Sequence, residues 1–336
     1  MTEDAAGFDL GASTPTRRKG TNPSRSPGDP WDCVIVGGGA AGLSAALVLG
    51  RARRHTLVVD ADEQSNRVVD VMGGHLGYDR RPPEELYKNG RDELATYPTV
   101  ELRRGHVLEA VNRDGAFDVQ LDDDTRTTAL TLLLATGMDY RLPEVPGLAE
   151  RWGRSVFHCP FCHGWEVKDQ TLGVLDGSIR AVERALLLRF WSDDVTLYTN
   201  GPADLSSADV ARLQRAGVPV EERVVKEVRG PADALEVIVF IDGRERRSAG
   251  LLVPAPMHQR SSLAAQLGAR VADPESTVTE ALAIDAAFRT SVPGLYAAGD
   301  VGAHALSSVA TAVAAGSAAA KAIVHDLVIA AYPATQ

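Results

Sequence analysis

The sequence has few cysteines, few aromatic residues and no excess of positive charge. Its 336 residues include only 3 cysteines, and Phe, Trp and Tyr together make up 5%. Three cysteines are too few for the disulfide framework of small secreted domains. Lys and Arg number 35 against 45 Asp and Glu, which gives a net charge of −10. Because nucleic acids bind basic surfaces, we expect no nucleic-acid partner.

Long apolar runs are also scarce. We find no stretch of about 18 apolar residues without charge, so we expect neither a membrane span nor a membrane partner. Residues 1–30 are rich in Gly, Pro, Ser and Thr and lack the apolar core of a secretory signal. We therefore expect a disordered tail over these residues and a cytoplasmic protein.

Strand-like and helical patterns alternate from Trp31 onward. A strand–helix–strand pattern fills residues 32–60, and a second fills residues 172–198. Such alternation predicts the α/β class, with two doubly wound Rossmann-like domains, the second inserted into the first. The predicted boundaries are 1–30 for the tail, 31–146 with 248–330 for the first domain, and 147–247 for the inserted domain.

A glycine-rich turn lies between the first predicted strand and its helix. Gly37, Gly39 and Gly42 form Gly-x-Gly-x-x-Gly, and Asp60 ends the next strand. Gly37 permits the tight turn, Gly39 lets backbone approach a pyrophosphate, and Gly42 allows close helix–strand packing. The helix N-terminus offers N–H groups to phosphates, and Asp60 can accept hydrogen bonds from a ribose. This context predicts a dinucleotide site rather than a merely flexible turn.

Cys159 and Cys162 are the candidate functional pair, because Cys33 lies in an apolar run and is expected to be buried. Two thiols three positions apart can form a disulfide, in which one sulfur is commonly the better nucleophile. Cys-x-x-Cys-His also occurs at haem attachment sites, but that reaction needs export and a haem pocket. A zinc site needs four ligands, and although His158 and His163 could contribute, there is no second Cys-x-x-Cys. We therefore favour a redox disulfide and expect no metal.

Two further motifs accompany the glycine-rich turn. One follows an apolar run and the other precedes a long Ala-rich helix; they are Ala135-Thr136-Gly137 and Gly299-Asp300. Together the motifs resemble the flavoprotein disulfide reductase family over residues 31–330, and most of all its low-molecular-weight thioredoxin reductases. The resemblance implies that the first domain binds FAD, with Asp300 on the ribitol, and that the protein is a homodimer.

By the same resemblance, Cys162 should face the flavin and Cys159 should exchange with the substrate. His163 stands where thioredoxin reductases carry Asp. An imidazole there can take a proton from an incoming thiol, unless it is only a packed turn residue. The first domain should supply further contacts to FAD, which are Ala40, Ala41, Ala61, Asn66, Arg67, His75, Val107, Ser308 and Val309.

The inserted domain departs from the thioredoxin reductase pattern. Where a second glycine-rich loop would bind NADPH, Asp176 and Ser178 replace the two glycines. A carboxylate at the pyrophosphate position is repulsive, and a Cβ blocks close backbone approach. Residues 198–204 also lack the Arg or Lys that would bind a 2′-phosphate. NADPH is therefore doubtful as a cofactor.

The segment Cys-Pro-Phe-Cys-His-Gly resembles the redox motif of thioredoxin-reductase-like dithiol oxidases, which close disulfides in gliotoxin- and holomycin-type natural products. That resemblance implies oxidation of a small-molecule or peptide dithiol, with molecular oxygen as the acceptor. Two alternatives stay open. One is an NADPH-dependent thioredoxin reductase with a divergent cofactor loop, and the other is a flavin-binding redox sensor without turnover.

Overall fold

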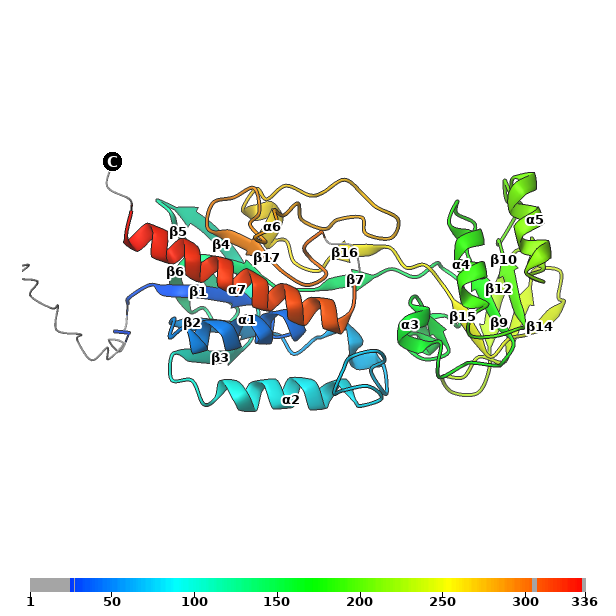
Figure 1. Cartoon of the computed structure of the whole chain (residues 1–336), viewed down its shortest axis with the longest axis horizontal. Coiled ribbons are helices and arrows are strands. Elements are labelled where there is room, and N and C mark those ends of the chain that lie inside the picture. Colours follow the sequence, from blue (N-terminus) through cyan, green and yellow to red (C-terminus); the bar gives the residue numbers. More distant parts are fainter. Residues whose placement is uncertain (1–24, 27, 304–306, 334–336) are drawn as a thin grey trace, which may run out of the picture.

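The computed structural model describes residues 25–26, 28–303 and 307–333, so most of the predicted tail lies outside the described residues. These residues form two lobes joined by two extended crossings of the chain (Figure 1). Each lobe contains a parallel sheet with helices packed against it. The α/β class and the two Rossmann-type sheets are thereby confirmed.

The first lobe is built on a seven-stranded sheet in the order β3-β2-β1-β6-β5-β4, with β17 also paired to β6. Strands β3, β2, β1, β6 and β17 run parallel, whereas β4 and β5 form an antiparallel extension. The strands are β1 (Trp31–Val36), β2 (Thr56–Asp60), β3 (Val100–Arg104), β4 (Val107–Arg113), β5 (Ala116–Leu121), β6 (Arg126–Leu134) and β17 (Leu295–Ala297).

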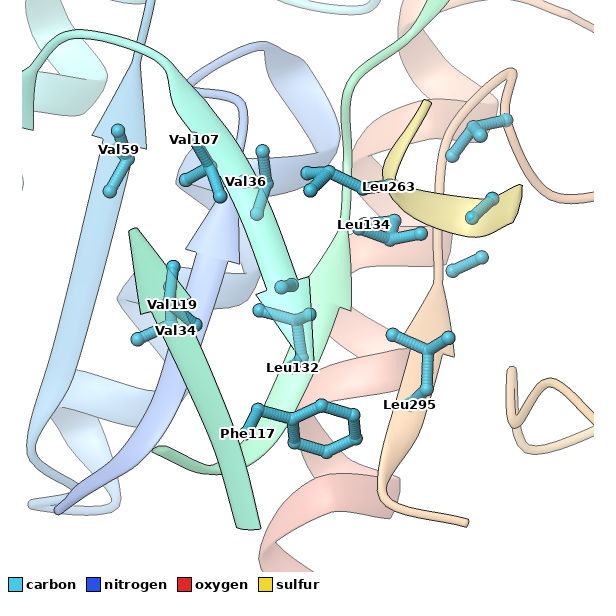
Figure 2. Close-up of a cluster of buried hydrophobic side chains, with 14 of the residues drawn as sticks. Val34, Val36, Val59, Val107, Phe117, Val119, Leu132, Leu134, Leu263 and Leu295 are labelled. Atoms are coloured by element: carbon cyan, nitrogen blue, oxygen red, sulfur yellow. The ribbon is translucent and has the colours of Figure 1, made fainter. Parts of the chain in front are cut away.

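Both faces of this sheet are covered, which explains why its parallel strands are continuous apolar runs. On one face Val34, Leu132 and Leu295 pack with Phe117 and Val119 of β5 (Figure 2). Helices cover the other face. They are α1 (Ala40–Arg51), α2 (Pro83–Leu94) and α7 (Val309–Ala331), and the lobe also contains η1 (Ser65–Val68) and α6 (Leu263–Gln266).

Cys33 lies under these helices and is fully buried. Burial raises the pKa of its thiol to about 12. The prediction that Cys33 is a buried apolar residue is confirmed.

The second lobe contains a five-stranded parallel sheet in the order β11-β10-β9-β15-β8 and a small antiparallel sheet of β12-β13-β14. The parallel strands are β8 (Val156–Phe157), β9 (Leu172–Leu175), β10 (Val195–Tyr198), β11 (Val220–Glu221) and β15 (Gly250–Leu252). The other elements are β12 (Val225–Arg229), β13 (Val237–Phe240), β14 (Glu245–Arg247), η2 (Ala149–Arg151), α3 (Pro160–His163), α4 (Ala181–Leu188) and α5 (Ser207–Arg215).

The predicted domain boundary at residue 247 comes too early. Strand β15 pairs with both β8 and β9, so residues 250–252 belong to the second sheet. The short run Gly250–Leu252 carries no periodicity that would assign it to either domain. Beyond it, β16 (Met257–Gln259) pairs with β7 (Met138–Tyr140) where the two crossings run side by side.

Helix α7 is the longest apolar helix of the described residues, although Lys321 and Asp326 interrupt its apolar run. Its length and mean hydropathy of 1.5 would suffice for a membrane crossing, by length and composition alone, and 28% of its most apolar window is buried. Polar contacts nevertheless attach it to the first lobe. Asp326 accepts hydrogen bonds from Arg289 and from the Tyr296 hydroxyl, both at 2.6 Å. Gly316 packs so closely on α1 that a Cβ would overlap the backbone of Ala41.

Candidate active site

A cavity of about 540 Å³ opens at the carboxyl ends of β1, β2, β6 and β17. This edge is where doubly wound sheets bind ligands. The second lobe completes the cavity with side chains from residues 152–163. Most of the predicted cofactor residues line it, namely Gly37, Gly39, Ala40, Ala41, Asp60, Ala61, Asn66, Val107, Ala135, Thr136, Gly137, Gly299, Asp300, Ser308 and Val309.

The glycine-rich turn is shaped by its close contacts. Gly37 has φ +106°, and a Cβ on it would come within 2.8 Å of the Ala135 carbonyl carbon. A Cβ on Gly42 would overlap the carbonyl oxygen of Gly37, so Gly42 serves packing and does not line the cavity. Gly39 differs, because the nearest atom to its Cβ position is Gln64 Cγ at 3.8 Å. Its missing side chain therefore leaves room on the cavity side.

Gly38, which the motif left unassigned, explains the position of Asp60. A Cβ on Gly38 would overlap the Asp60 carboxylate, and the Gly38 N–H donates to Asp60 Oδ1 at 3.2 Å. The same oxygen accepts from the Asp62 N–H at 3.0 Å and from Gln64 Nε2 at 3.1 Å. These bonds hold a buried carboxylate at the cavity wall.

The cavity suits a large polar cofactor. Helix α1 begins at Ala40 with no side-chain cap and no acidic residue in its first turn, so its N–H groups point to the cavity unneutralised. The Asn66 side chain accepts from the Tyr87 hydroxyl at 2.6 Å, but its Nδ2 is buried with no hydrogen-bond partner among the described residues. A buried orphan donor of this kind is costly unless a ligand satisfies it. The residues present therefore fit a dinucleotide.

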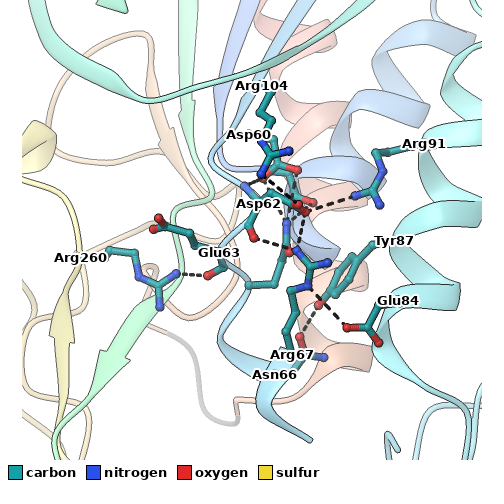
Figure 3. Close-up of polar contacts among 12 residues, drawn as sticks. Asp60, Asp62, Glu63, Asn66, Arg67, Glu84, Tyr87, Arg91, Arg104 and Arg260 are labelled. Carbon is teal, nitrogen blue, oxygen red and sulfur yellow. Dashed lines mark hydrogen bonds and ion pairs between the residues drawn. The ribbon is translucent and has the colours of Figure 1, made fainter. Parts of the chain in front are cut away.

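Arg67 and His75, which were predicted to contact the cofactor, do not line this cavity. Arg67 pairs with Asp62 at 2.6 Å and with Glu84 at 3.6 Å (Figure 3). These contacts brace the loop, and the hydrogen bond from Arg67 lowers the pKa of the Asp62 carboxyl. Arg67 lines only a smaller adjoining cavity of about 420 Å³. His75 lines neither cavity and stacks on Tyr78, with ring centroids 5.7 Å apart.

The redox pair lies at the start of α3. Cys159 and Cys162 form a disulfide, and the Cys159 carbonyl accepts the N–H of Cys162 and of His163, both at 3.2 Å. Pro160 occupies the first helical position, where its fixed φ favours the turn. Cys162 lines the large cavity, whereas Cys159 does not. The expected division of labour, with Cys162 toward the flavin and Cys159 toward the substrate, stays a prediction.

His163 also lines the cavity and stacks on Phe157, with ring centroids 5.8 Å apart. Burial lowers the pKa of its imidazole, although the backbone of Gly153 and of Cys159 opposes that effect. Neither ring nitrogen has a hydrogen bond of good geometry to another described residue. A neutral ring with open nitrogens can accept a proton at neutral pH.

Three aromatic residues that form one wall of the cavity were not among the predicted site residues. His158 lines the cavity between Tyr140 and Trp152, with ring centroids at 4.8 and 5.5 Å. Burial and the nearby His163 lower the pKa of His158 to about 4. Tyr140 donates from its hydroxyl to Asp300 at 3.3 Å, so this wall touches a predicted cofactor residue. The position of His158 beside Cys159 was the one available signal.

The loop after β9 contains a buried carboxylate, that of Asp176. The Asp176 side chain is 3% exposed, accepts the Ser178 N–H at 2.8 Å and forms an ion pair with Arg184 of α4. Ser178 Oγ accepts from Arg184 as well, at 3.3 Å. A carboxylate and its counter-ion thus occupy the turn where the sequence comparison places a dinucleotide phosphate.

Metal ligation receives no support from the described part of the chain. Residues 25–26, 28–303 and 307–333 contain no group of three or more His, Cys, Asp or Glu side chains that could hold a metal ion.

Two Rossmann-type sheets that meet at one cavity across a disulfide define the class of disulfide oxidoreductases with a dinucleotide cofactor. The chain belongs to the pyridine nucleotide-disulphide oxidoreductase family, which it matches over residues 31–316. Membership implies a flavin cofactor, and the protein is a thioredoxin-reductase-like flavin oxidoreductase.

Individual proteins refine this assignment. The chain is 33% identical to thioredoxin reductase tcpT of Claviceps purpurea, over 84% of this chain and 89% of that protein. It is similar to the crystal structure of an oxidoreductase from Agrobacterium tumefaciens, with 37% identity, a TM-score of 0.84 and coverage of 90% and 99%. HlmI gives 38% identity, a TM-score of 0.81 and coverage of 90% and 95%. The resemblance to thioredoxin-reductase-like proteins that include the gliotoxin- and holomycin-type branch is confirmed.

Proposed function

We propose that this flavoprotein oxidises a small-molecule or peptide dithiol to a disulfide through Cys159–Cys162, with molecular oxygen as the final acceptor. The observation that carries the proposal is the contrast between the two lobes. Cys162 lines the large cavity, while the phosphate turn of the second lobe is filled by Asp176 and Arg184. Electrons therefore have a route from the disulfide to the cavity, whereas NADPH has only a poor binding site in the second lobe.

The first lobe would hold FAD with residues already described. Gly39 and the N-terminus of α1 would receive the pyrophosphate, and Asp60 the adenosine ribose. Asn66 Nδ2 and Asp300 would bind nearer the flavin end, beside Cys162. When bound, FAD supplies a two-electron acceptor that oxygen can reoxidise.

The residues of α3 then account for the chemistry. One substrate thiol gives its proton to His163 and attacks Cys159, which breaks the S–S bond and leaves Cys162 as a thiolate at the cavity. The second substrate thiol attacks the mixed disulfide, releasing the product disulfide and the Cys159 thiol. Passing two electrons onward restores Cys159–Cys162. In sum, dithiol and oxygen give disulfide and hydrogen peroxide, so electrons and protons balance.

Anaerobic mixing tests the proposal. Purified protein should lose its visible flavin absorbance on addition of a dithiol such as dithiothreitol, and should regain it with peroxide formation when oxygen is admitted. NADPH alone should bleach it slowly or not at all. Fast bleaching by NADPH would replace the proposal by the reductase alternative, which the intact parallel sheet around β9 favours. Bleaching by neither reductant would favour a redox sensor without turnover.

Assembly and location belong to the same proposal. We propose a cytoplasmic homodimer that needs no nucleic acid or membrane. Helix α7 supports self-association, because Val328 and Ile329 expose 52% and 53% of their surface. Sedimentation of the holoprotein at micromolar concentration should give twice the 35.7 kDa chain mass.

A further inference from the structure

The disulfide and most of the cavity belong to different lobes. Helix α3 is part of the second lobe, whereas β1, β2, β6 and β17 of the first lobe carry most of the cavity walls. Electron transfer between the sulfur and a cofactor requires close approach, and small displacements of reacting groups are costly. Contacts that hold α3 against the first lobe therefore bear on the reaction.

Gly73 makes one of these contacts, directly with the backbone of Cys162. A Cβ on Gly73 would overlap the carbonyl oxygen of Cys162 and lie 3.1 Å from its carbonyl carbon. The φ angle of Gly73 is not in the left-handed region, so glycine is required here for space and not for conformation. The neighbouring Met72 pairs with Arg81 across a β-bridge, with its N–H 2.9 Å from the Arg81 carbonyl, which restrains the segment.

The residues around Gly73 extend the contact. Asp70 binds Arg154 of the second lobe through two nitrogens, at 3.0 and 3.3 Å. A Cβ on Gly153 would lie 2.6 Å from Val68 Cγ2, so Gly153 packs directly against the Val68 side chain. We call residues 68–74 the seat of the redox helix.

The second lobe supports α3 from its own side. A Cβ on Gly164, directly after α3, would lie 2.7 Å from Trp191 Cδ1. The ring of Phe161 meets Trp191 edge-on, with centroids 5.3 Å apart. Helix α3 is thus packed on Trp191 within its own lobe and on Gly73 of the other lobe.

We propose that Gly73 is a positioning residue for the redox reaction, and that the seat fixes Cys162 at the cavity. The inference rests on the proposed electron transfer between the disulfide and FAD. Arg154 assists, because it also pairs with Asp233 of its own lobe at 2.9 Å and so links the seat to the second sheet. A methyl group at residue 73 separates Cys162 from the cavity without removing any cofactor ligand or sulfur.

Gly73→Ala is the first test. The variant should retain FAD at wild-type stoichiometry but show dithiol-driven bleaching slower by about tenfold or more. After reduction, Cys162 should be alkylated by iodoacetamide several times faster than in wild type, as measured peptide by peptide. Gly77→Ala is the matched control. It strains the same loop at φ +84°, but its Cβ would meet nothing within 4 Å, so Cys162 should stay protected.

A second pair of variants removes the risk that Gly73→Ala fails to fold. Asp70→Asn weakens the ion pair of Arg154 between the lobes, whereas Asp233→Asn weakens the ion pair of Arg154 within the second lobe. Exposed ion pairs have small effects, so Asp70→Asn should expose Cys162 to alkylation about twofold to fivefold and Asp233→Asn should not. Unchanged alkylation and bleaching in Gly73→Ala, or equal effects of the two Asn variants, would overturn the seat. The alkylation rate of Cys162 does not depend on which reductant supplies the electrons. It therefore tests the role of the seat separately from the proposed function, even if NADPH proves to be the reductant.

Discussion

Arg184 forms its ion pair with a carboxylate, Asp176, that stands at the end of β9 and is almost fully buried. The other guanidinium nitrogen donates to Ser276 of the first lobe at 3.1 Å. A charge pair held in this way satisfies both partners internally. The turn therefore needs no external anion, and an incoming phosphate would have to displace Asp176 from Arg184.

Asp176→Gly should consequently improve the binding of NADPH. The substitution removes a repulsive charge, allows backbone approach and leaves Arg184 free to meet a phosphate, so the dissociation constant should fall by about tenfold. Titration of the protein with NADPH, followed by tryptophan fluorescence or calorimetry, measures the change. Asp193→Gly is the control, because Asp193 is fully exposed in the same lobe and carries the same charge. Equal gains in both variants would mean that net charge alone acts.

Cys162→Ser should separate cofactor binding from electron transfer. Serine preserves the shape of α3, so FAD should remain bound, but no disulfide can form and dithiols should no longer bleach the flavin. Absorbance spectra before and after anaerobic dithiol addition provide the measurement. Cys33→Ala should bleach normally, because Cys33 is buried away from the cavity. Dithiol-driven bleaching in Cys162→Ser would remove this sulfur from the pathway.

Much of the first lobe could be predicted because its signals are local. The apolar runs of β1 and β2, the glycine-rich turn and Asp60 lie within thirty residues of one another, and their order implies their geometry. The redox pair could be predicted equally well, because two cysteines three positions apart in the sequence can form a disulfide without any long-range contact.

What could not be predicted depends on contacts between distant segments. Gly73 matters because Cys162, some ninety positions later, packs on it, and nothing in the local sequence marks that contact. Tyr140 and Trp152 reach the cavity only because the two lobes meet there. His75 does not line the cavity, because the loop that the resemblance assigned to the cofactor turns the His75 ring toward Tyr78.

Asp326→Asn should test whether the hydrogen bonds of Asp326 attach α7 to the first lobe. The hydrogen bond with Arg289 lowers the pKa of Asp326 to about 2, so the carboxylate stabilises the fold at neutral pH. That contribution is complete above the ordinary carboxyl pKa and is lost as the pH falls toward 2. Loss of the Arg289 and Tyr296 contacts should lower the free energy of unfolding by about 1–3 kcal/mol at pH 7.

Chemical denaturation at pH 7 and pH 3 gives the comparison for Asp326→Asn. The variant and wild type should differ less at pH 3, because the unfolded wild-type chain takes up a proton at Asp326 below the ordinary carboxyl pKa, whereas the folded state does not. Asp92→Asn provides the control, since its pair with Lys88 is exposed on α2. If Asp326→Asn matched this control at both pH values, the carboxylate would not anchor α7.

His163→Asn should slow the thiol exchange step in a pH-dependent way. Burial lowers the pKa of His163, so its ring stays neutral and able to accept a proton below the ordinary histidine pKa. Loss of a general base costs about 10²–10⁴-fold in rate. A dithiol that is already ionised needs no base, so the deficit of the variant should shrink as the pH rises toward the thiol pKa.

Anaerobic stopped-flow bleaching by dithiothreitol between pH 6 and pH 9 measures this deficit. The wild-type rate should fall on the acid side only once the pH passes below the lowered pKa of His163, where the ring takes up a proton. His106→Asn serves as the control, because His106 also borders the large cavity but lies on the loop before β4, away from α3. A constant ratio of wild-type to His163→Asn rates across the whole range would show that His163 packs against Phe157 without transferring protons.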